Sequence, residues 1–505
     1  MSGALLVAGT TSDAGKSVVT AGICRWLARQ GVKVAPFKAQ NMSLNSMVTR
    51  DGAEIGRAQA MQAAAARVEP EAAMNPVLLK PGSERRSQVV LLGRPIDEVD
   101  ALSYRDLKAQ LREAVMESFA DLRMRYDVVV CEGAGSPTEI NLRARDIANL
   151  GLARAVGMPV VVVGDINRGG VFASMFGTLA LLDAADQALV AGFVVNKFRG
   201  DAALLQPGLD MLRRLTGRLV LGVLPWLPGL RLDVEDSLDL AERGSLDDDG
   251  SAPPRGEEVL RVAVVRFPLI SNFTDADALA AEPGVVVRFV TRPEELADAD
   301  LLVLPGSRAT VADLAWLRAR GLADAVVRWA AAGRPVLGVC GGYQMLAREI
   351  HDEVESGAGV VPGLGLLPAV VRFGPQKVLG RPRGTAYGEI VEGYEIRHGV
   401  VSVEGGEPFL DGCRLGAVRG TSWHGAFEND GFRRAFLREV AQATGRRFVP
   451  ADDVSFAGIR ERRFDALGTL VADHLDTDTL LRLLDQGAPA GLPFVPPGAP
   501  GGAQL

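Results

Sequence analysis

Two short stretches of the chain combine residue types that are common in catalysis. GTTSDAGKS, residues 9–17, places Lys16 and Ser17 directly after Gly15. A glycine-rich loop ending in Lys-Ser can bind phosphate through its backbone amides and its lysine. GVCGGYQ, residues 338–344, surrounds Cys340 with glycines. A cysteine on such a turn is a candidate nucleophile, so the chain carries the elements of two different reactions.

The first stretch has an unusual spacing for a phosphate loop. Five residues separate Gly9 from Gly15, where the common pattern has four, and Thr10 stands at the place of the first glycine. It follows an apolar run at 4–9 and precedes a helical pattern at 16–30, which is the context that such a loop needs. Lys16 would then reach the β- and γ-phosphates and Ser17 would bind Mg²⁺. The alternative is a tight strand-to-helix turn that needs glycine only for its backbone.

The five-residue spacing resembles the dethiobiotin synthetase group. In that group ATP phosphorylates a carboxylate or carbamate, which a nitrogen nucleophile then attacks. The resemblance implies ATP and Mg²⁺ as cofactors. It implies nucleotide or phosphate contacts from Gly9, Thr10, Gly15, Lys16, Ser17, Lys38 and Asn196. The metal ligands would be Ser17, Glu132 and Asp51. Taken singly, Glu132 can also be a helix cap and Asn196 a turn former.

The cysteine stretch has the pattern of a nucleophile elbow. Cys340 ends a short apolar strand and precedes the helical start GGYQMLA. The amide of Gly341 would stabilise a developing oxyanion, and Gly306, which caps a neighbouring predicted strand, offers a second donor. The alternative is a buried structural thiol. We expect that alternative for Cys24, Cys131 and Cys413, which lie in predicted core segments.

A cysteine nucleophile needs a base, and the chain has 4 histidines. His424, in GTSWHGAFEND, follows a predicted strand and has small neighbours. The pair resembles class I glutamine amidotransferases, whose pattern G-x-C-x-G-x-Q is matched from Gly338 to Gln344. That family usually has Glu two positions after the histidine, where this chain has Ala426. Glu428 is the nearest carboxylate, so the sequence leaves the third member of the triad open.

Four further stretches resemble the cobyric acid synthase family: FKAQNMSLNS, MNPVLLKP, GDINRGGVFAS and GYEIRHG. The last departs from the usual GYEIH-x-G, because Arg397 precedes His398. The resemblance, over residues 1–440, implies amidation of the b, d, e and g carboxylates of adenosylcobyrinic acid a,c-diamide with ATP and L-glutamine. It implies Gln40, Asn41 and Arg168 as substrate contacts. Arg57, Arg85, Arg86, Arg143 and Arg145 are further candidates for a polycarboxylate, although each is individually expected to be a solvated surface charge.

Three other functions remain open. A cobyrinic acid a,c-diamide synthase, or another glutamine-dependent amidoligase, would use the same two chemistries. A kinase or dethiobiotin-type ligase would leave the second half inert. A partition-type ATPase shares the unusual phosphate loop but leaves the cysteine stretch without a role.

Composition sets broad limits on the protein. With 505 residues the chain should form two or three domains. A net charge of -7 argues against nucleic acid as a partner. The 4 cysteines form no closely spaced pair, which fits a reducing cytoplasm. The N-terminus has no signal-peptide pattern, and no apolar run is long enough to span a membrane, so we expect a cytoplasmic protein without a membrane partner.

The elements that must position these residues alternate between strand and helix. Buried strands are expected at 4–9, 127–133, 159–165 and 189–197, and again at 259–267, 284–290, 299–306 and 334–342. This predicts two doubly wound α/β domains, an N-terminal P-loop domain and a flavodoxin-like glutamine amidotransferase domain. We expect their bounds at 1–242 and 259–445, with a linker at 243–258. A helical extension at 446–486 and a disordered tail at 487–505 would follow.

Overall fold

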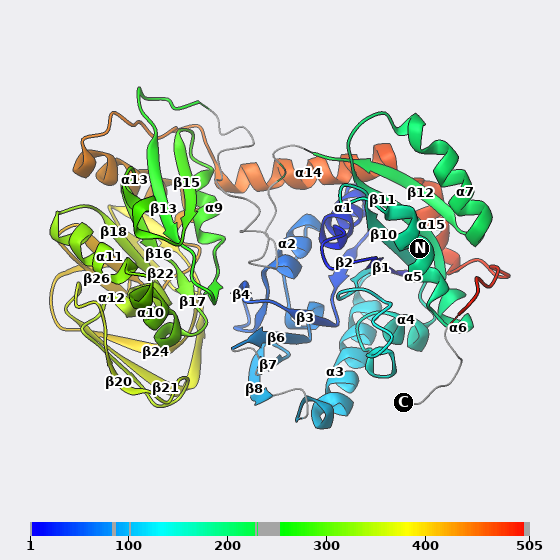
Figure 1. Ribbon diagram of the computed structural model, residues 1–505, viewed down its shortest axis with the longest axis horizontal. Coiled ribbons are helices and arrows are strands. Elements are labelled where there is room, and N and C mark those ends of the chain that lie inside the picture. Colours follow the sequence, from blue (N-terminus) through cyan, green and yellow to red (C-terminus); the bar gives the residue numbers. More distant parts are fainter. Residues whose placement is uncertain (1–2, 83–86, 100–102, 228–229, 231–252, 499–505) are drawn as a thin grey trace.

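The computed structural model has two lobes joined along one side by a long helix (Figure 1). It describes residues 3–82, 87–99, 103–227, 230 and 253–498. The N-terminal half forms one lobe, and the segment from about residue 260 to 445 forms the other. The two predicted α/β units are therefore present, and each is built around its own parallel sheet.

The first lobe centres on a six-stranded sheet in the order β12-β11-β10-β1-β9-β2, in which every pairing is parallel. Its strands are β1 (Gly3–Gly9), β2 (Val34–Phe37), β9 (Val128–Glu132), β10 (Val160–Asp165), β11 (Val190–Phe198) and β12 (Leu219–Pro225). The apolar runs expected as strands are nearly all buried because helices cover both faces. Strand β1 lies between β9 and β10, so the loop after β1 opens where the strand order reverses, the usual ligand position in such sheets.

The helices of this lobe alternate with its strands. They are α1 (Lys16–Arg29), α2 (Arg57–Ala65), α3 (Ser103–Arg125), α4 (Leu150–Val156), α5 (Val171–Ala180), α6 (Ala184–Gln187) and α7 (Gln206–Thr216), with 3-10 turns at Ala72–Met74, Arg143–Arg145 and Ala202–Leu205. A smaller sheet contains β3 (Gln40–Met42), β6 (Val77–Pro81), β7 (Ser87–Leu91) and β8 (Arg94–Val99). Beside it, β4 (Ser46–Val48) pairs with β5 (Glu54–Gly56), and in Figure 1 this part of the lobe faces the other lobe.

The second lobe centres on a seven-stranded sheet in the order β15-β13-β16-β18-β27-β26-β25. Its strands are β13 (Leu260–Val265), β15 (Val285–Val290), β16 (Leu301–Leu304), β18 (Val336–Val339), β25 (Glu407–Phe409), β26 (Gly412–Leu415) and β27 (Val418–Thr421). Pairing is parallel from β15 to β27 and antiparallel at the β26 edge. The carboxyl ends of β13, β18 and β27 therefore meet at one edge of the sheet.

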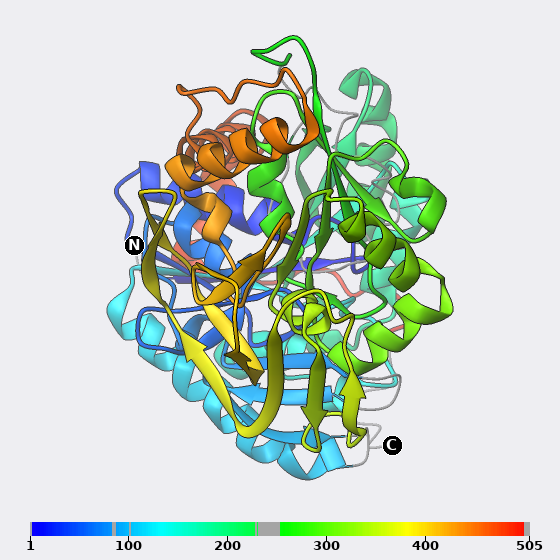
Figure 2. The ribbon, with the colours of Figure 1, turned by 90° about the vertical axis from the view of Figure 1, so that its left-hand side faces the viewer.

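Helices and short sheets surround this core. The helices are α9 (Asp275–Ala280), α10 (Thr310–Ala319), α11 (Leu322–Ala331), α12 (Gly341–Leu346) and α13 (Asp430–Thr444), with 3-10 turns at Pro293–Leu296 and Ala426–Glu428. A four-stranded sheet of this lobe, which faces the viewer in Figure 2, contains β19 (Glu349–Asp352), β20 (Gly359–Pro362), β21 (Ala369–Gly380) and β24 (Glu395–Val403). Two short pairs complete the lobe: β14 (Ile270–Ser271) with β17 (Gly306–Ser307), and β22 (Arg383–Ala386) with β23 (Glu389–Glu392).

The C-terminal segment returns to the first lobe. Helix α14 (Phe456–His474) crosses between the lobes in Figure 1, and α15 (Thr477–Gln486) follows it. Leu467 and Val471 of α14 and Leu480 of α15 are buried in the apolar core that covers one face of the first sheet. From Phe464 onward the predicted helical extension is thus part of the first lobe's core, because its apolar face covers helix α1 and strand β1, whereas Phe448 and Phe456 pack in the core of the second lobe.

The segment after α15 differs from the expected disordered tail. Val495 is 3% exposed and lies in the core of the first lobe. Gln187 donates to the Val495 carbonyl oxygen and accepts from its amide, at 2.9 and 2.8 Å. One apolar side chain and these backbone contacts hold the segment in spite of its proline and glycine content. Residues 499–505 and most of the expected linker, 243–252, lie outside the described residues. Within the described part of the chain, no helix is long and apolar enough to cross a membrane.

Candidate active sites

Cys340 lies between strand β18 and helix α12 in a strained backbone conformation. Its φ of 48° and ψ of -109° are rare for a residue with a side chain. The elbow needs the glycines that follow it, because a side chain at Gly341 would lie 2.7 Å from the Ser307 amide nitrogen and one at Gly342 would collide with the Leu304 backbone. The local sequence therefore predicts this turn correctly, and the strain is of the kind that accompanies functional positions.

His424 follows strand β27 and is 1% exposed. Its Nδ1 lies 2.7 Å from Oδ2 of Asp275, the first residue of α9, and the other Asp275 oxygen accepts from the Gly425 amide at 2.7 Å. Burial opposes a charged imidazole, but the Asp275 carboxylate and the Cys340 sulfur outweigh it and raise the pKa of His424 to about 10. A cysteine, a histidine and an orienting carboxylate are thus assembled in one place.

Asp275 is the carboxylate that contacts His424, so it is our candidate for the third member of the triad that the sequence left open. Glu428, the nearest carboxylate in sequence, instead pairs with Arg57 and with Arg460. Asp275 comes shortly after β13, the first strand of this lobe, 149 positions before His424. The one signal in the sequence was an acidic residue placed beyond the carboxyl end of a parallel strand, at the same sheet edge as Cys340.

Gly306 lies beside the histidine on the short strand β17. A side chain there would lie 2.9 Å from Cε1 of His424, so only glycine allows this close approach. The next residue, Ser307, donates through its hydroxyl to Asp313 at 2.5 Å and accepts from the Ala309 amide at 3.1 Å. These contacts fix the loop that carries Gly306, which remains our candidate for the second oxyanion donor beside Gly341.

The stretch GYEIRHG also borders the cysteine. Cys340 Sγ lies 3.6 Å from the Ile396 carbonyl oxygen, and Gln344 Nε2 donates to the Gly399 carbonyl oxygen at 3.3 Å. Arg397 donates to the same Gly399 oxygen at 3.0 Å. The resemblance alone left the position of this stretch undecided, and the structure places it on β24 against the nucleophile.

A small cavity beside Cys340 is lined by both lobes. Lys80 and Gln88 come from the first lobe, and Lys377 and Arg397 come from the second. Its volume of about 40 Å³ is enough for a molecule of the size of water or ammonia, but not for an amino acid. Lys377 also donates to Gln88 at 3.1 Å across the boundary between the lobes. The cysteine site therefore opens toward the other half of the chain.

The phosphate loop lies between β1 and α1 and has the geometry expected of it. Gly15 has a φ of 93° at the start of α1, and the side-chain amide of Asn196 donates to the Ala14 carbonyl oxygen at 3.0 Å. Lys16 Nζ donates to the carbonyl oxygens of Thr11 and Ser12, at 2.9 and 2.8 Å. Gly9 and Thr10 enter the loop from β1. Asn196 thus supports the loop directly.

Glu132, at the end of β9, contacts two other predicted residues. It accepts from Ser17 at 2.9 Å and from Lys38 at 3.0 Å. Burial alone would raise its pKa, but Lys38, Gln62 and Lys16 hold the pKa of Glu132 below its ordinary value. Gln62 of α2, which the sequence analysis did not single out, donates to the second oxygen of Glu132. Serine, lysine and carboxylate therefore meet at the start of α1.

The remaining predicted residues lie farther out. Asp51 is exposed in the turn between β4 and β5, where it accepts from Thr49, and none of its contacts in the described part of the chain reaches Ser17 or Glu132. Asn41 is buried and donates to Gln59 at 2.8 Å, while Gln40 beside it is half-buried. The structure thus does not bring Asp51 to the loop, and Asn41 supports helix α2.

Among the candidate arginines, Arg168 pairs with Asp13 of the phosphate loop at 2.9 Å and is half-exposed. Arg57 is instead buried and Arg143 pairs with Asp186. Arg85 and Arg86 lie outside the described residues. Asp165, at the end of β10, was not predicted; it accepts from Lys197 at 2.8 Å on the far side of β1 from Glu132.

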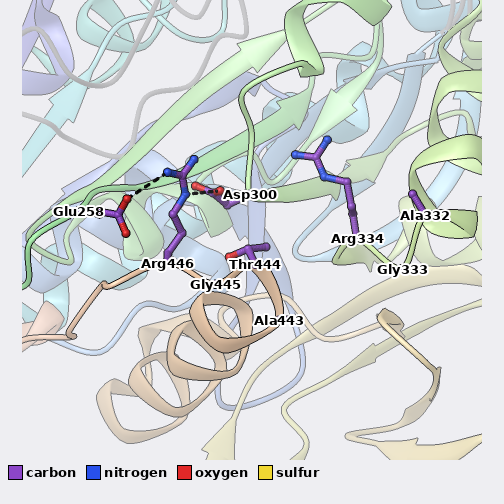
Figure 3. Close-up of a pocket in the computed structure, with 9 residues that line it drawn as sticks. All are labelled: Glu258, Asp300, Ala332, Gly333, Arg334, Ala443, Thr444, Gly445 and Arg446. Atoms are coloured by element: carbon purple, nitrogen blue, oxygen red, sulfur yellow. Dashed lines mark hydrogen bonds and ion pairs between the residues drawn. The ribbon is translucent and has the colours of Figure 1, made fainter.

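A larger cavity, of about 370 Å³, lies at the amino ends of strands of the seven-stranded sheet (Figure 3). It is bordered by Asp300 and Arg334, which precede β16 and β18, whereas Cys340 follows β18. Arg446 pairs there with Asp300 at 2.8 Å and with Glu258 at 3.5 Å. The charges compensate one another and no candidate nucleophile lines the cavity, so it does not belong to the catalytic centres.

Comparison with known proteins agrees with both lobes. Residues 5–239 match the model of the CobQ/CobB/MinD/ParA nucleotide binding domain, and residues 261–432 match that of the CobB/CobQ-like glutamine amidotransferase domain. The chain is thus a nucleotide-binding domain joined to a glutamine amidotransferase domain, which is the class of protein that the two sites define.

Full-length relatives identify the family. The chain is 68% identical over 501 residues to a cobyric acid synthase from Streptomyces avermitilis and 69% identical over 501 residues to one from Streptomyces coelicolor. Each match covers 99% of this chain and 100% of the relative. A cobyric acid synthase from Frankia casuarinae is 66% identical over 520 residues, with the same coverage. The chain belongs to the cobyric acid synthase family.

Proposed function

We propose that the protein amidates the b, d, e and g carboxylates of adenosylcobyrinic acid a,c-diamide, using ATP and the amide nitrogen of L-glutamine. The observation that carries this proposal is the pair of complementary sites. A thiol centre that can release ammonia lies beside a cavity to which the nucleotide-binding half contributes Lys80 and Gln88. The relatives are named cobyric acid synthases, which supports a corrinoid acid as the acceptor.

Glutamine cleavage begins at Cys340. The His424 imidazolium, held by Asp275, favours the thiolate, which attacks the side-chain amide carbon of glutamine. The backbone amides of Gly341 and Gly306 stabilise the oxyanion. His424 then donates its proton to the departing nitrogen, so that ammonia leaves and a γ-glutamyl thioester remains. Water hydrolyses the thioester to glutamate and regenerates the thiol.

Carboxylate activation takes place at the phosphate loop. The loop amides and Lys16 hold the phosphates of ATP, and Lys38, which donates to Glu132 beside the loop, stabilises the charge that develops on the transferred γ-phosphoryl group. The substrate carboxylate attacks that group, releasing ADP and forming an acyl phosphate. Ammonia then displaces phosphate from the acyl carbon and, on losing a proton, gives the amide.

The residues present fit Mg²⁺. Ser17 and Glu132 offer hydroxyl and carboxylate oxygens 2.9 Å apart at the phosphate site. In the described part of the chain, no three acidic, histidine or cysteine side chains form a metal cluster. One or two protein oxygens completed by nucleotide phosphates and water are the usual Mg²⁺ environment. The ion would neutralise phosphate charge, and Ser17 and Glu132 would hold it; Asp51 is not part of this set.

We also propose that the functional division of the chain follows the two lobes. The ATP-dependent unit spans residues 1–242, and the glutamine unit spans 259–445 after the linker 243–258. The core contacts of α14 and α15 support adding residues 464–486 to the ATP-dependent unit, whereas Phe448 and Phe456 pack in the core of the glutamine unit. The glutamine unit folds around its own sheet and core. A point substitution at its active site in the full-length protein should therefore leave the fold of the ATP-dependent unit intact.

The test is amidation followed by mass spectrometry. The purified protein is incubated with ATP, Mg²⁺ and glutamine, and either cobyrinic acid or its a,c-diamide as the acceptor. Four successive replacements of OH by NH₂ on the a,c-diamide support the proposal. Two replacements, on cobyrinic acid only, would instead identify an a,c-diamide synthase. Consumption of ATP without any amide product would refute both.

A further inference from the structure

Helix α2 has an unusual composition for a buried helix. Its side chains Arg57, Gln59 and Gln62 are 3%, 0% and 0% exposed. Burying a guanidinium and two amides is costly unless each finds polar partners. An apolar helix would pack here at lower cost, so these residues are expected to serve the contacts that they make.

One end of α2 belongs to the nucleotide site. Gln62 donates to Glu132, the carboxylate that also accepts from Ser17 and Lys38. One turn earlier, Gln59 accepts from Asn41 at 2.8 Å. The position of the helix is therefore fixed by the same carboxylate that organises the phosphate site.

The other end of α2 reaches into the glutaminase lobe. Arg57, its first residue, donates to Glu428 and lies over the ring of Tyr394, with its guanidinium carbon 5.9 Å from the ring centroid. Both partners belong to the second lobe. A guanidinium above an aromatic face is an attractive arrangement, and it is stronger when the groups are buried.

Tyr394 is in turn the neighbour of the catalytic histidine. The two rings stack with centroids 5.4 Å apart and planes at 30°. The backbones are also paired, because the Tyr394 and His424 amides each donate to the other's carbonyl oxygen at 2.9 Å. Asn272 donates to the Tyr394 hydroxyl at 2.8 Å and to the Ser46 carbonyl oxygen of the first lobe at 2.6 Å. Asp275 therefore holds the edge of the imidazole, while Tyr394 covers one of its faces.

We propose that Arg57 and Tyr394 are positioning residues through which the nucleotide half completes the glutaminase site. This inference rests on the amidoligase function above and adds two residues to it. Arg57 holds the Tyr394 ring, and the ring holds the His424 imidazole in line with Cys340 and Asp275. Because α2 also carries Gln62, the geometry of the histidine depends on the carboxylate that organises the phosphate site. Glutamine is thus cleaved efficiently only when the two halves are docked.

The test uses Arg57→Met in the full-length protein, which keeps the length of the side chain and removes its charge and planar group. We expect kcat for glutamate release to fall about tenfold, as misplacement of a catalytic group predicts. KM for glutamine should change less than about twofold, because the contacts of Arg57 with Glu428 and the Tyr394 ring act on the histidine and not on the bound glutamine. Ammonia-driven amidation should retain the wild-type rate, because it does not use His424.

Two further variants test the route through the ring. Tyr394→Phe keeps the stacked ring and removes only the hydroxyl contact with Asn272, so it should lose less activity than Tyr394→Ala. Arg57→Lys restores the charge without the planar group, so its kcat should lie between those of the wild type and Arg57→Met. The matched control is Arg50→Met, which removes an exposed arginine paired with Glu69 and should leave all rates unchanged.

The outcomes distinguish a positioning role for Arg57 from a general role in the fold. Wild-type kcat for glutamate release in Arg57→Met would overturn the inference. Equal losses of the glutamine-driven and ammonia-driven rates would also overturn it, because Arg57 would then support the fold or the nucleotide site in general. Glutamate release and ATP binding are measured directly. A wild-type protein that cleaves glutamine but forms no amide would therefore count against the proposed function and leave the Arg57 result readable.

Discussion

The two proposed catalytic centres differ in how many of their side chains are already held by contacts within the protein. At the glutaminase centre, Asp275 bonds to His424, and the Cys340 turn is fixed by backbone that only glycine permits. At the phosphate loop, Lys16 instead donates to the carbonyl oxygens of Thr11 and Ser12. ATP would have to replace these partners with phosphate oxygens.

This contrast follows from what each centre binds. Cleavage of a neutral amide needs one nucleophile, one acid–base group and an oxyanion site, and preorganisation of these lowers the barrier directly. ATP brings several negative charges that pair with the lysines of its site. Without ATP, these lysines must donate to oxygens of the protein instead. The glutaminase centre is accordingly a set of fixed contacts, and the phosphate centre is a set of exchangeable ones.

The strongest way to separate the two centres is Cys340→Ser paired with Lys16→Ala. Loss of the thiol should reduce glutamine-driven amidation by more than about a thousandfold while leaving the ammonia-driven rate intact. Loss of Lys16 should reduce both rates by about a hundredfold or more, because both need the acyl phosphate. Rates with glutamine and with ammonium chloride are measured side by side. Ammonia-driven activity that disappears in Cys340→Ser would mean that the centres are not separable.

Asp275→Asn tests whether the fixed contacts matter. The amide cannot stabilise an imidazolium as the carboxylate does, so the pKa of His424 should fall toward its ordinary value. Glutamate release should drop by about two to four orders of magnitude, as when a triad carboxylate becomes neutral elsewhere. The kcat for glutamate release is measured across pH, with Glu428→Gln as a control that should lose no more than the about tenfold expected of Arg57→Met, because Glu428 holds Arg57. A larger loss in the control would return the orienting role to Glu428.

The sequence predicted the parts of each centre that depend on neighbours along the chain. Cys340 with its glycines and Lys16 with Ser17 form short turns whose backbone requirements are written in adjacent residues. The apolar runs of the parallel sheets were recognisable for the same reason. Tertiary partners were not. Asp275 meets His424 only because β13 and β27 end at one sheet edge, and the one local signal, an acidic residue beyond the end of β13, does not say which residue it contacts.

Two other differences have the same origin. Asp51 was a reasonable metal ligand by residue type, but it occupies an exposed turn between two short strands that the sequence did not predict. The packing of α14 and of Val495 against the first lobe joins segments separated by hundreds of residues. The proline- and glycine-rich composition of residues 487–498 predicted disorder. One buried valine and a few backbone hydrogen bonds hold the segment, and neither changes the overall composition.

Glu54 links the two lobes, and its substitution tests the contact between them. This carboxylate is fully buried and accepts from Lys80 and Lys377, each at 2.6 Å, one from either lobe. Burial opposes its charge, but the two ammonium groups outweigh burial and hold the pKa of Glu54 well below its usual range. Glu54→Gln leaves two buried cations without their anion, which should cost about 3–5 kcal/mol.

The loss should appear as a lower unfolding temperature and as more glutamine hydrolysed per amide formed, since the cavity beside Cys340 includes both lysines. Removing one of the stranded cations in Glu54→Gln/Lys377→Met should recover part of the stability, in a double-mutant cycle. Glu69→Gln, at an exposed ion pair, is the control. Additive losses in the cycle would show that Glu54 and Lys377 do not act as a pair.

The smallest expected effect concerns Asp313, which holds the Ser307 hydroxyl beside Gly306. Burial raises the pKa of Asp313 from its ordinary value of 3.8 to about 6, so the folded protein favours the neutral carboxyl. The stabilising contribution is complete below about pH 4 and is lost as pH rises through 6. Asp313→Asn, which is always neutral, should therefore gain stability relative to the wild type between pH 5 and 8. The gain is at most about 3 kcal/mol, since each pKa unit corresponds to about 1.4 kcal/mol.

Unfolding temperatures of Asp313→Asn and the wild type at pH 5 and pH 8 measure this gain, with the exposed Asp324→Asn as the control. A difference between variant and wild type that does not change with pH would mean that the Asp313 carboxylate is ionised throughout this range and that burial does not govern it.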